Sequence, residues 1–187
     1  MKKVSILAFA GSLRKDSFNK ALVHAAVELA PENVAIKVFD LNGIPPFNEE
    51  LETNPPEIVR QFKDKIRGAD ALLIATPEYN YSIPGVLKNA IDWASRPKAD
   101  TPLMGKPVAI MSASTGRLGG ARAQYHLRQT FVFLDMEPLN RPEVMLSDAA
   151  HNIDVDGNLT NEQTRQLIVQ QLEALTAWTI KLKQTPP

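Results

Sequence analysis

The chain alternates short apolar runs with amphipathic segments of helical periodicity, and this alternation restricts the folds that it can adopt. We expect five strands, at residues 4–10, 35–41, 71–76, 107–113 and 138–145. Helices are expected between them and after the last strand, at residues 17–29, 58–69, 84–93, 121–134 and from about 160 onward. Runs that are apolar on both faces are typical of strands buried in a parallel sheet. The order of elements therefore predicts a doubly wound α/β fold.

Five strands alternating with five helices favour the flavodoxin-like three-layer sandwich, with strand order 2-1-3-4-5, over the six-stranded dinucleotide-binding order. The 187 residues contain no evident linker or repeat, so residues 1–187 are expected to form a single domain. Residues 160–163 fit a capping box that opens the last helix. Ligands of such sheets bind where the carboxyl ends of the strands meet. The loops at 11–19, 77–82 and 114–120 are expected there.

Composition excludes several classes of function. Lys and Arg number 21, as do Asp and Glu, and this balance argues against a nucleic-acid binder. The chain has no cysteine, which excludes thiolate chemistry, so redox chemistry would need a cofactor. No apolar run approaches the roughly 18 residues of a membrane span, and the apolar stretch at 4–10 is too short for a signal peptide. The three histidines lie far apart, so no metal site is expected, and we expect a cytoplasmic protein.

The first loop, residues 11–19, follows a strand and opens a helix. A helix N-terminus offers unpaired N–H groups and a positive dipole end, which suit an anion. Ser12, Ser17 and Asn19 can donate hydrogen bonds, and Arg14 can add a charge-assisted pair. The loop is neither G-x-G-x-x-G nor a P-loop, so a terminal phosphate is favoured over a pyrophosphate. The alternative is that Ser17 is only an N-cap and Arg14 is solvated.

The other two loops have compositions suited to a flat ligand. In residues 77–84, two prolines flank a polar and aromatic tip that can lay backbone N–H groups and a ring against such a ligand. In residues 112–120, small residues allow close approach of the backbone. The alternatives are a rigid turn whose tyrosines cover the end of the sheet, and glycines that serve only as turn residues.

Three segments together resemble the NADPH-dependent FMN reductase family, most closely its bacterial members that reduce quinones, chromate and azo dyes. They are GSLRKDSFNKAL (11–22), TPEYNYSIPGVLKNAIDW (76–93) and GGARAQYHLRQ (119–129). The resemblance extends from the first strand to about residue 143. It implies a flavodoxin-like fold, non-covalently bound FMN, NADPH or NADH as co-substrate, and a homodimer or homotetramer.

The resemblance also implies which residues contact FMN. The phosphate would be held by Ser12, Arg14, Ser17 and Asn19. The isoalloxazine and ribityl parts would be lined by Pro77, Glu78, Tyr79 and Asn80, and the other side of the ring would be closed by Ser114, Gly116 and Gly119. We assign no catalytic acid, base or nucleophile, because the flavin carries the hydride. A backbone N–H of residues 78–80 is expected to tune the ring.

The resemblance implies an oxidoreductase that passes hydride from NAD(P)H through FMN to small-molecule acceptors by a ping-pong mechanism. Quinones, free flavin, azo compounds and metal oxyanions all remain open as acceptors. The alternatives are a flavodoxin-like electron carrier without nicotinamide turnover and a binding module without flavin. Arg122, Tyr125 and Gln129 share one helical face, with Glu143 on the next segment. This face is either an oligomer interface or an ordinary solvated surface.

Overall fold

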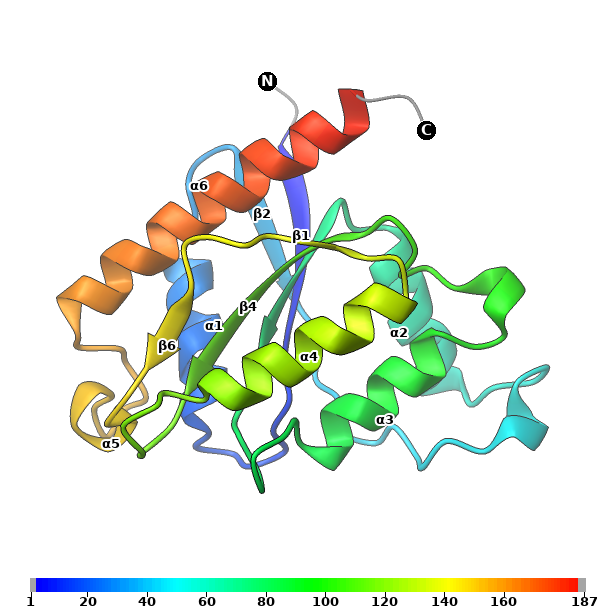
Figure 1. Ribbon diagram of the computed structural model, residues 1–187, viewed down its shortest axis with the longest axis horizontal. Coiled ribbons are helices and arrows are strands. Elements are labelled where there is room, and N and C mark those ends of the chain that lie inside the picture. Colours follow the sequence, from blue (N-terminus) through cyan, green and yellow to red (C-terminus); the bar gives the residue numbers. More distant parts are fainter. Residues whose placement is uncertain (1–2, 185–187) are drawn as a thin grey trace.

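In the computed structural model, which describes residues 3–184, the alternating elements form a parallel sheet covered by helices on both faces (Figure 1). The predicted strand order 2-1-3-4-5 is confirmed, with a short sixth strand added beside β4. The strands are β1 (Val4–Ala10), β2 (Val34–Val38), β3 (Ala71–Ala75), β4 (Pro107–Ala113), β5 (Glu137–Pro138) and β6 (Val144–Leu146).

In the described part of the chain, six α-helices connect and cover these strands. They are α1 (Phe18–Glu28), α2 (Glu57–Arg67), α3 (Gly85–Ala94), α4 (Ala121–Phe133), α5 (Ala149–Asn152) and α6 (Glu162–Gln184), with 3-10 turns at Glu49–Leu51 and Lys98–Asp100. The buried side chains of α1 and α6 pack on one face of the sheet, and those of α2, α3 and α4 pack on the other. Within residues 3–184, no helix combines the length and apolar character needed to span a membrane.

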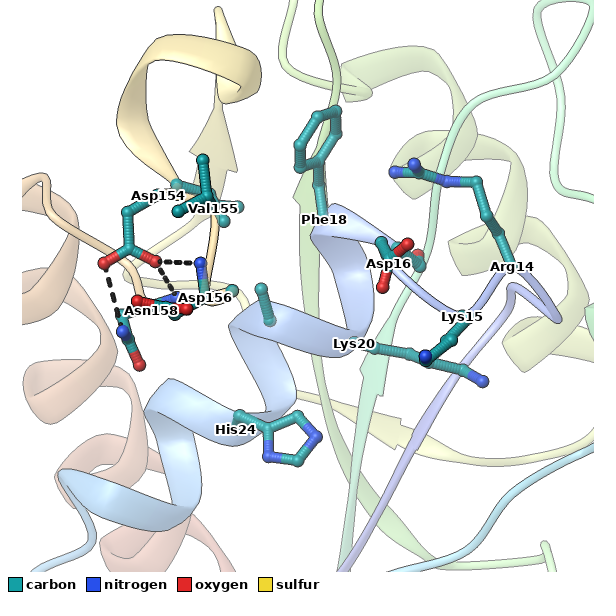
Figure 2. Close-up of a pocket in the computed structure, with 14 residues that line it drawn as sticks. Arg14, Lys15, Asp16, Phe18, Lys20, His24, Asp154, Val155, Asp156 and Asn158 are labelled. Carbon is teal, nitrogen blue, oxygen red and sulfur yellow. Dashed lines mark hydrogen bonds between the residues drawn. The ribbon is translucent and has the colours of Figure 1, made fainter.

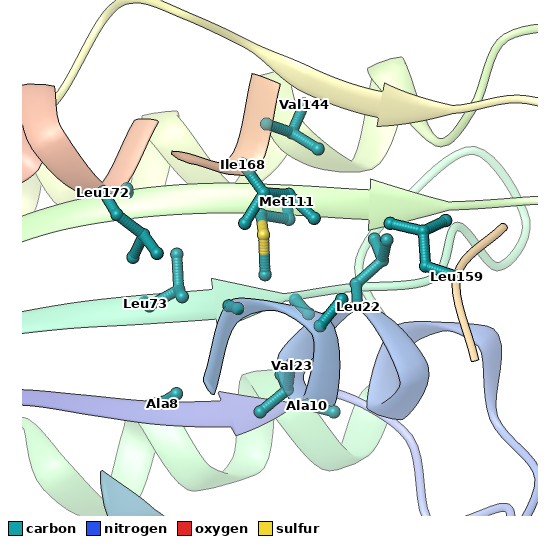
Figure 3. Close-up of a cluster of buried hydrophobic side chains, with 14 of the residues drawn as sticks. Ala8, Ala10, Leu22, Val23, Leu73, Met111, Val144, Leu159, Ile168 and Leu172 are labelled. Carbon is teal, nitrogen blue, oxygen red and sulfur yellow. The ribbon is translucent and has the colours of Figure 1, made fainter. Parts of the chain in front are cut away.

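The three central strands are buried on both faces, and their side chains alternate between two cores. In β1, Ala8 and Ala10 face α1 and α6, whereas Leu7 and Phe9 face the other layer. The strand residues on the α1 side include six alanines, and Figure 3 shows Leu22 and Val23 of α1 in the same cluster of side chains. Because alanine keeps the backbones close, α1 lies near the sheet and its first turn is held close to the strand ends.

The carboxyl ends of β1, β3 and β4 lie side by side because the sheet hydrogen bonds continue past the strands. The N–H of Gly11 donates to the carbonyl oxygen of Ala75 (2.8 Å). The N–H of Thr76 donates to the carbonyl oxygen of Met111 (2.9 Å). These bonds bring the loops that follow the three strands to one edge of the sheet, as the sequence predicts.

The structure differs from the expectation at four places. The second strand, expected at 35–41, ends at Val38. The expected fifth strand at 138–145 is two short strands, because Pro142 has no N–H to donate to a sheet and lies in the irregular segment between β5 and β6. The expected loop after β6 contains the four-residue helix α5. Asn161, rather than Thr160, caps α6: its side-chain oxygen accepts from the N–H of Thr164 (2.8 Å), so the cap lies one residue later than expected and residue N3 is Thr164 instead of Gln163.

Gly120, the N-cap of α4, tests how tightly the start of this helix packs, and Gly157 serves as a control with a similar φ in open space. Gly120 has φ = +86°, and a Cβ there would lie 2.7 Å from Ser112 Cβ; Gly157 has φ = +85° but nothing within 4 Å. We expect Gly120→Ala to lower the free energy of unfolding by about 2–5 kcal/mol, from the left-handed backbone and the overpacking together. Gly157→Ala should lose only about 1–2 kcal/mol. Urea unfolding at equal m-values measures both, and equal losses would contradict the steric account.

Candidate functional site

A cavity of about 210 Å³ lies at the carboxyl ends of β1, β3 and β4, between all three predicted loops. Eight of the eleven residues implied by the resemblance line it: Ser12, Arg14, Ser17, Asn19, Pro77, Glu78, Tyr79 and Ser114. Asn80, Gly116 and Gly119 do not line it. Three residues that the sequence reasoning did not name, Phe18, Ala113 and Thr115, complete the lining. Each of the three is next in sequence to a predicted site residue. The sequence therefore predicted the right segments but not these individual residues. We call this cavity the cradle.

One end of the cradle is the start of α1. Ser17 is the N-cap of this helix, and its hydroxyl oxygen accepts from the N–H of Asn19 (3.3 Å). The first turn of a helix also has N–H groups without partners in the helix. Arg14 is exposed, its guanidinium lies 4.9 Å from the centre of the Phe18 ring, and within residues 3–184 it forms no ion pair. This end therefore offers a cation, hydroxyls and helix N–H groups to an anion.

Asn19 is buried and has a structural task. Its side-chain amide donates to the carbonyl oxygen of Ala113 (3.0 Å), and its side-chain oxygen accepts from the N–H of Ala113 (2.9 Å). This reciprocal pair fastens α1 to the end of β4. Asn19 thus fixes the two walls of the cradle relative to each other, and its direct contact with a phosphate stays a prediction.

The second loop ends in a tight turn. The N–H of Tyr79 donates to the carbonyl oxygen of Ser82 (3.0 Å), and the N–H of Ser82 donates back to Tyr79 (2.9 Å). Asn80 and Tyr81 between them both have positive φ, at 50° and 67°. The Glu78 side chain is turned out of the loop toward α4, where it accepts from the N–H of Arg122 (3.1 Å). The Glu78 carboxylate is therefore held by the start of α4.

The third loop is shaped by backbone contacts. The N–H of Ser114 donates to the carbonyl oxygen of Leu146 in β6 (3.0 Å), and the Ser114 hydroxyl accepts from the N–H of Gly116 (3.1 Å). The hydroxyl of Ser112 donates to the carbonyl oxygen of Gly119 (2.5 Å). Gly116 and Gly119 thus hold the shape of the loop, while Ser114 reaches the cradle itself.

A larger cavity, of about 490 Å³, adjoins the cradle along α1 and shares Arg14, Ser17 and Phe18 with it (Figure 2). Asp154 lies across this cavity from Phe18. Hydrogen bonds from the backbone and side chain of Asn158 lower the pKa of the Asp154 carboxyl below its ordinary value, so this carboxylate keeps its negative charge to lower pH. Residues 3–184 contain no group of three or more His, Asp or Glu side chains placed to hold a metal ion.

The residues of the cradle fit FMN. Buried hydroxyls, an exposed guanidinium and a helix N-terminus suit a doubly charged phosphate monoester. Pro77, Tyr79 and Ala113 offer apolar surface to a flat ring system, with the backbone of the second loop beside it. The fold and this site together define a flavodoxin-like flavoprotein, with the ligand bound at the ends of a parallel sheet.

Comparison with known proteins gives the family. Residues 4–151 match the family described as NADPH-dependent FMN reductase. The chain is 53% identical to an NAD(P)H-dependent FMN reductase of Pseudomonas aeruginosa, over 96% of this chain and 97% of that protein. It is 44% identical to a 2-hydroxy-1,4-benzoquinone reductase of a Burkholderia species, over 94% and 96%. The solved flavoenzyme FerB, an NAD(P)H:(acceptor) oxidoreductase of Paracoccus denitrificans, has a TM-score of 0.87 and 35% identity, over 95% and 98%.

The chain therefore belongs to the NADPH-dependent FMN reductase family, as the three sequence segments predicted. Its fold, its FMN cofactor and its NAD(P)H co-substrate are those of the family. The contacts of individual residues with FMN stay predictions, and they are testable one by one.

Arg14 is the side chain of the cradle best placed to neutralise a phosphate. A hydrogen bond to a charged group contributes roughly 1.5–3 kcal/mol, so we expect Arg14→Ala to weaken FMN binding roughly 10- to 150-fold. Arg117→Ala is the matched control, because it removes an exposed arginine of the third loop that does not line the cradle. Fluorescence titration of the apoprotein with FMN measures both. Equal losses in the two variants would mean that only the general charge matters.

Proposed function

We propose that this protein is an FMN-dependent NAD(P)H:quinone reductase. The observation that carries the proposal is the convergence of three loops on one cradle, with an anion-binding end at α1 and an apolar end at Pro77 and Tyr79. Relatives named as quinone reductases, such as the one from Pseudomonas putida at 42% identity over 96% of both chains, support a quinone as acceptor. Azo compounds, free flavin and metal oxyanions stay predictions as further acceptors.

FMN when bound supplies the redox chemistry, accepting a hydride from the nicotinamide and passing it on to the acceptor. The protein supplies binding and orientation. Arg14, Ser12 and the first turn of α1 would hold the phosphate, which sets the position of the whole cofactor. Pro77 and the backbone of residues 78–79 would lie along the ring, where N–H groups stabilise negative charge that develops on it.

The side of the cradle formed by the tips of the second and third loops is open to solvent. Tyr79, Tyr81 and Leu118 are all more than half exposed at the tips of the second and third loops. We propose that the nicotinamide and the acceptor use this side in turn, and that the first leaves before the second binds. Such alternate use of one site gives ping-pong kinetics. Because NAD(P)H is the reductant, we also expect the protein to work in the cytoplasm.

Anaerobic spectroscopy tests the proposal. We expect the purified protein to contain FMN whose visible absorption is bleached by NADPH or NADH and restored by 1,4-benzoquinone. Steady-state rates at several quinone concentrations should give parallel lines in double-reciprocal plots. Flavin that stays oxidised with both nicotinamides would instead indicate an electron carrier. A protein that binds no FMN after reconstitution would contradict both functions.

We further propose that the exposed face of α4 is covered by a second copy of this chain, giving a homodimer or, by a second contact, a homotetramer. Tyr125, Val132 and Phe133 all project from α4 with more than half of their surface exposed. Apolar side chains grouped on one helix of a water-exposed surface are typical of protein interfaces. Arg122 and Gln129, which the sequence left as either interface or solvated surface, lie on the same helix.

The oligomer can be tested at Val132, which is 82% exposed. We expect Val132→Asp to shift the protein toward monomer in sedimentation velocity at micromolar concentration, because a carboxylate buried in an apolar interface is strongly unfavourable. Val155→Asp is the control, since Val155 is as exposed but lies in the turn before α6. A wild-type protein that is monomeric at this concentration would refute the proposed assembly.

A further inference from the structure

The Glu78 carboxylate belongs to the flavin loop but contacts α4. Its side chain is only 7% exposed. It accepts hydrogen bonds from the N–H groups of Arg122 (3.1 Å) and Ala123 (3.4 Å) and forms a close ion pair with the Arg122 guanidinium. The N-cap of α4 is Gly120, which has no side chain, and the first turn contains no acidic residue. Glu78 therefore supplies the negative charge that a helix N-terminus favours.

Arg122 in turn contacts the tip of the same loop. Its guanidinium lies over the Tyr81 ring, 3.6 Å from the ring centre, in cation–π geometry. Tyr81 has φ = +67°, a left-handed conformation that is unusual and unfavourable for a bulky residue. Such a conformation persists only where the surroundings fix it. The guanidinium on one side and the two hydrogen bonds of the turn provide this restraint.

We propose that Glu78 is a positioning residue for the flavin ring, acting through Arg122 and Tyr81. The inference rests on the proposed flavin site, because Pro77 and Tyr79, on either side of Glu78, line the cradle. The carboxylate binds the start of α4 and so anchors the middle of the loop to this helix. The guanidinium anchors its tip. Both anchors fix the backbone of residues 77–80, which is the part that meets the ring, while the phosphate end at α1 does not depend on them.

This separation of the two ends gives a specific test with FMN and riboflavin, which share the ring and differ in the phosphate. We expect Glu78→Gln, which keeps an oxygen acceptor but removes the ion pair, to weaken the binding of both flavins roughly 5- to 20-fold, the range of coupling through one network of contacts. The ratio of the two affinities should stay within about twofold of wild type. Arg14→Ala should change that ratio, because it acts on the phosphate.

Two further variants show whether Arg122 transmits the effect. Arg122→Met, although outside the cradle, should weaken both flavins by a similar factor. The double variant Glu78→Gln/Arg122→Met should lose no more flavin affinity than either single variant, because both substitutions interrupt the same chain of contacts. Asp92→Asn is the control, since it removes the carboxylate of the Lys88–Asp92 ion pair on α3, which does not touch the loop. It should leave both affinities unchanged.

Several outcomes would overturn the inference. Unchanged flavin affinities in folded Glu78→Gln and Arg122→Met, or additive losses in the double variant, would show that the contacts serve stability alone. A loss for FMN without a loss for riboflavin would place the effect at the phosphate. These results would leave the proposed function intact. A wild-type protein that binds neither flavin would instead remove the proposed site, and the inference with it.

Discussion

The site depends on the hydrogen-bond register of the parallel sheet at its carboxyl edge. The bonds from Gly11 to Ala75 and from Thr76 to Met111 extend the pairing beyond β1 and β3, so the chain leaves three neighbouring strands at nearly the same level. Loops that are distant in sequence therefore begin a few ångströms apart. A shift of one residue in this register would separate the loops, and it would also turn the core side chains of the shifted strand to the opposite face of the sheet.

The small side chains on one face of the sheet are the second condition. Ala8, Ala10 and Ala113 let α1 lie close to the strands, and the reciprocal hydrogen bonds between Asn19 and Ala113 fasten its first turn to the end of β4. The N-terminus of α1 is thus held at a fixed place beside the loop after β4. Because a helix N-terminus attracts an anion only at short range, its placement matters as much as the residues around it.

The sequence predicts most helices and strands of this structure, because their apolar residues recur with regular spacing. Most helix bounds follow from hydrophobic periodicity, the strand order follows from the number and alternation of the elements, and the three loops follow from their places after strands. It reveals less where tertiary contacts decide. Pro142 divides the fifth strand, and Asn161 takes the cap expected of Thr160. The direction of the Glu78 side chain depends on the start of α4, more than 40 residues away. The spacing of residues 77–82 does not show whether the Glu78 side chain contacts a ligand or caps the N-terminus of α4.

Glu78 and Asn19 show that some residues of the cradle hold its walls in place, whereas others line it. Both stand in motifs that suggest direct ligand contact, yet the side chains of both bind the protein's own backbone. A flavin needs few chemical groups from the protein, because its ring carries the hydride, but it needs a rigid and well-oriented surface. Residues that hold loops in place are then as necessary as residues that touch the cofactor. In such a site the motif marks the position of the cradle, and only the hydrogen-bond partners show which side chains build it and which ones line it.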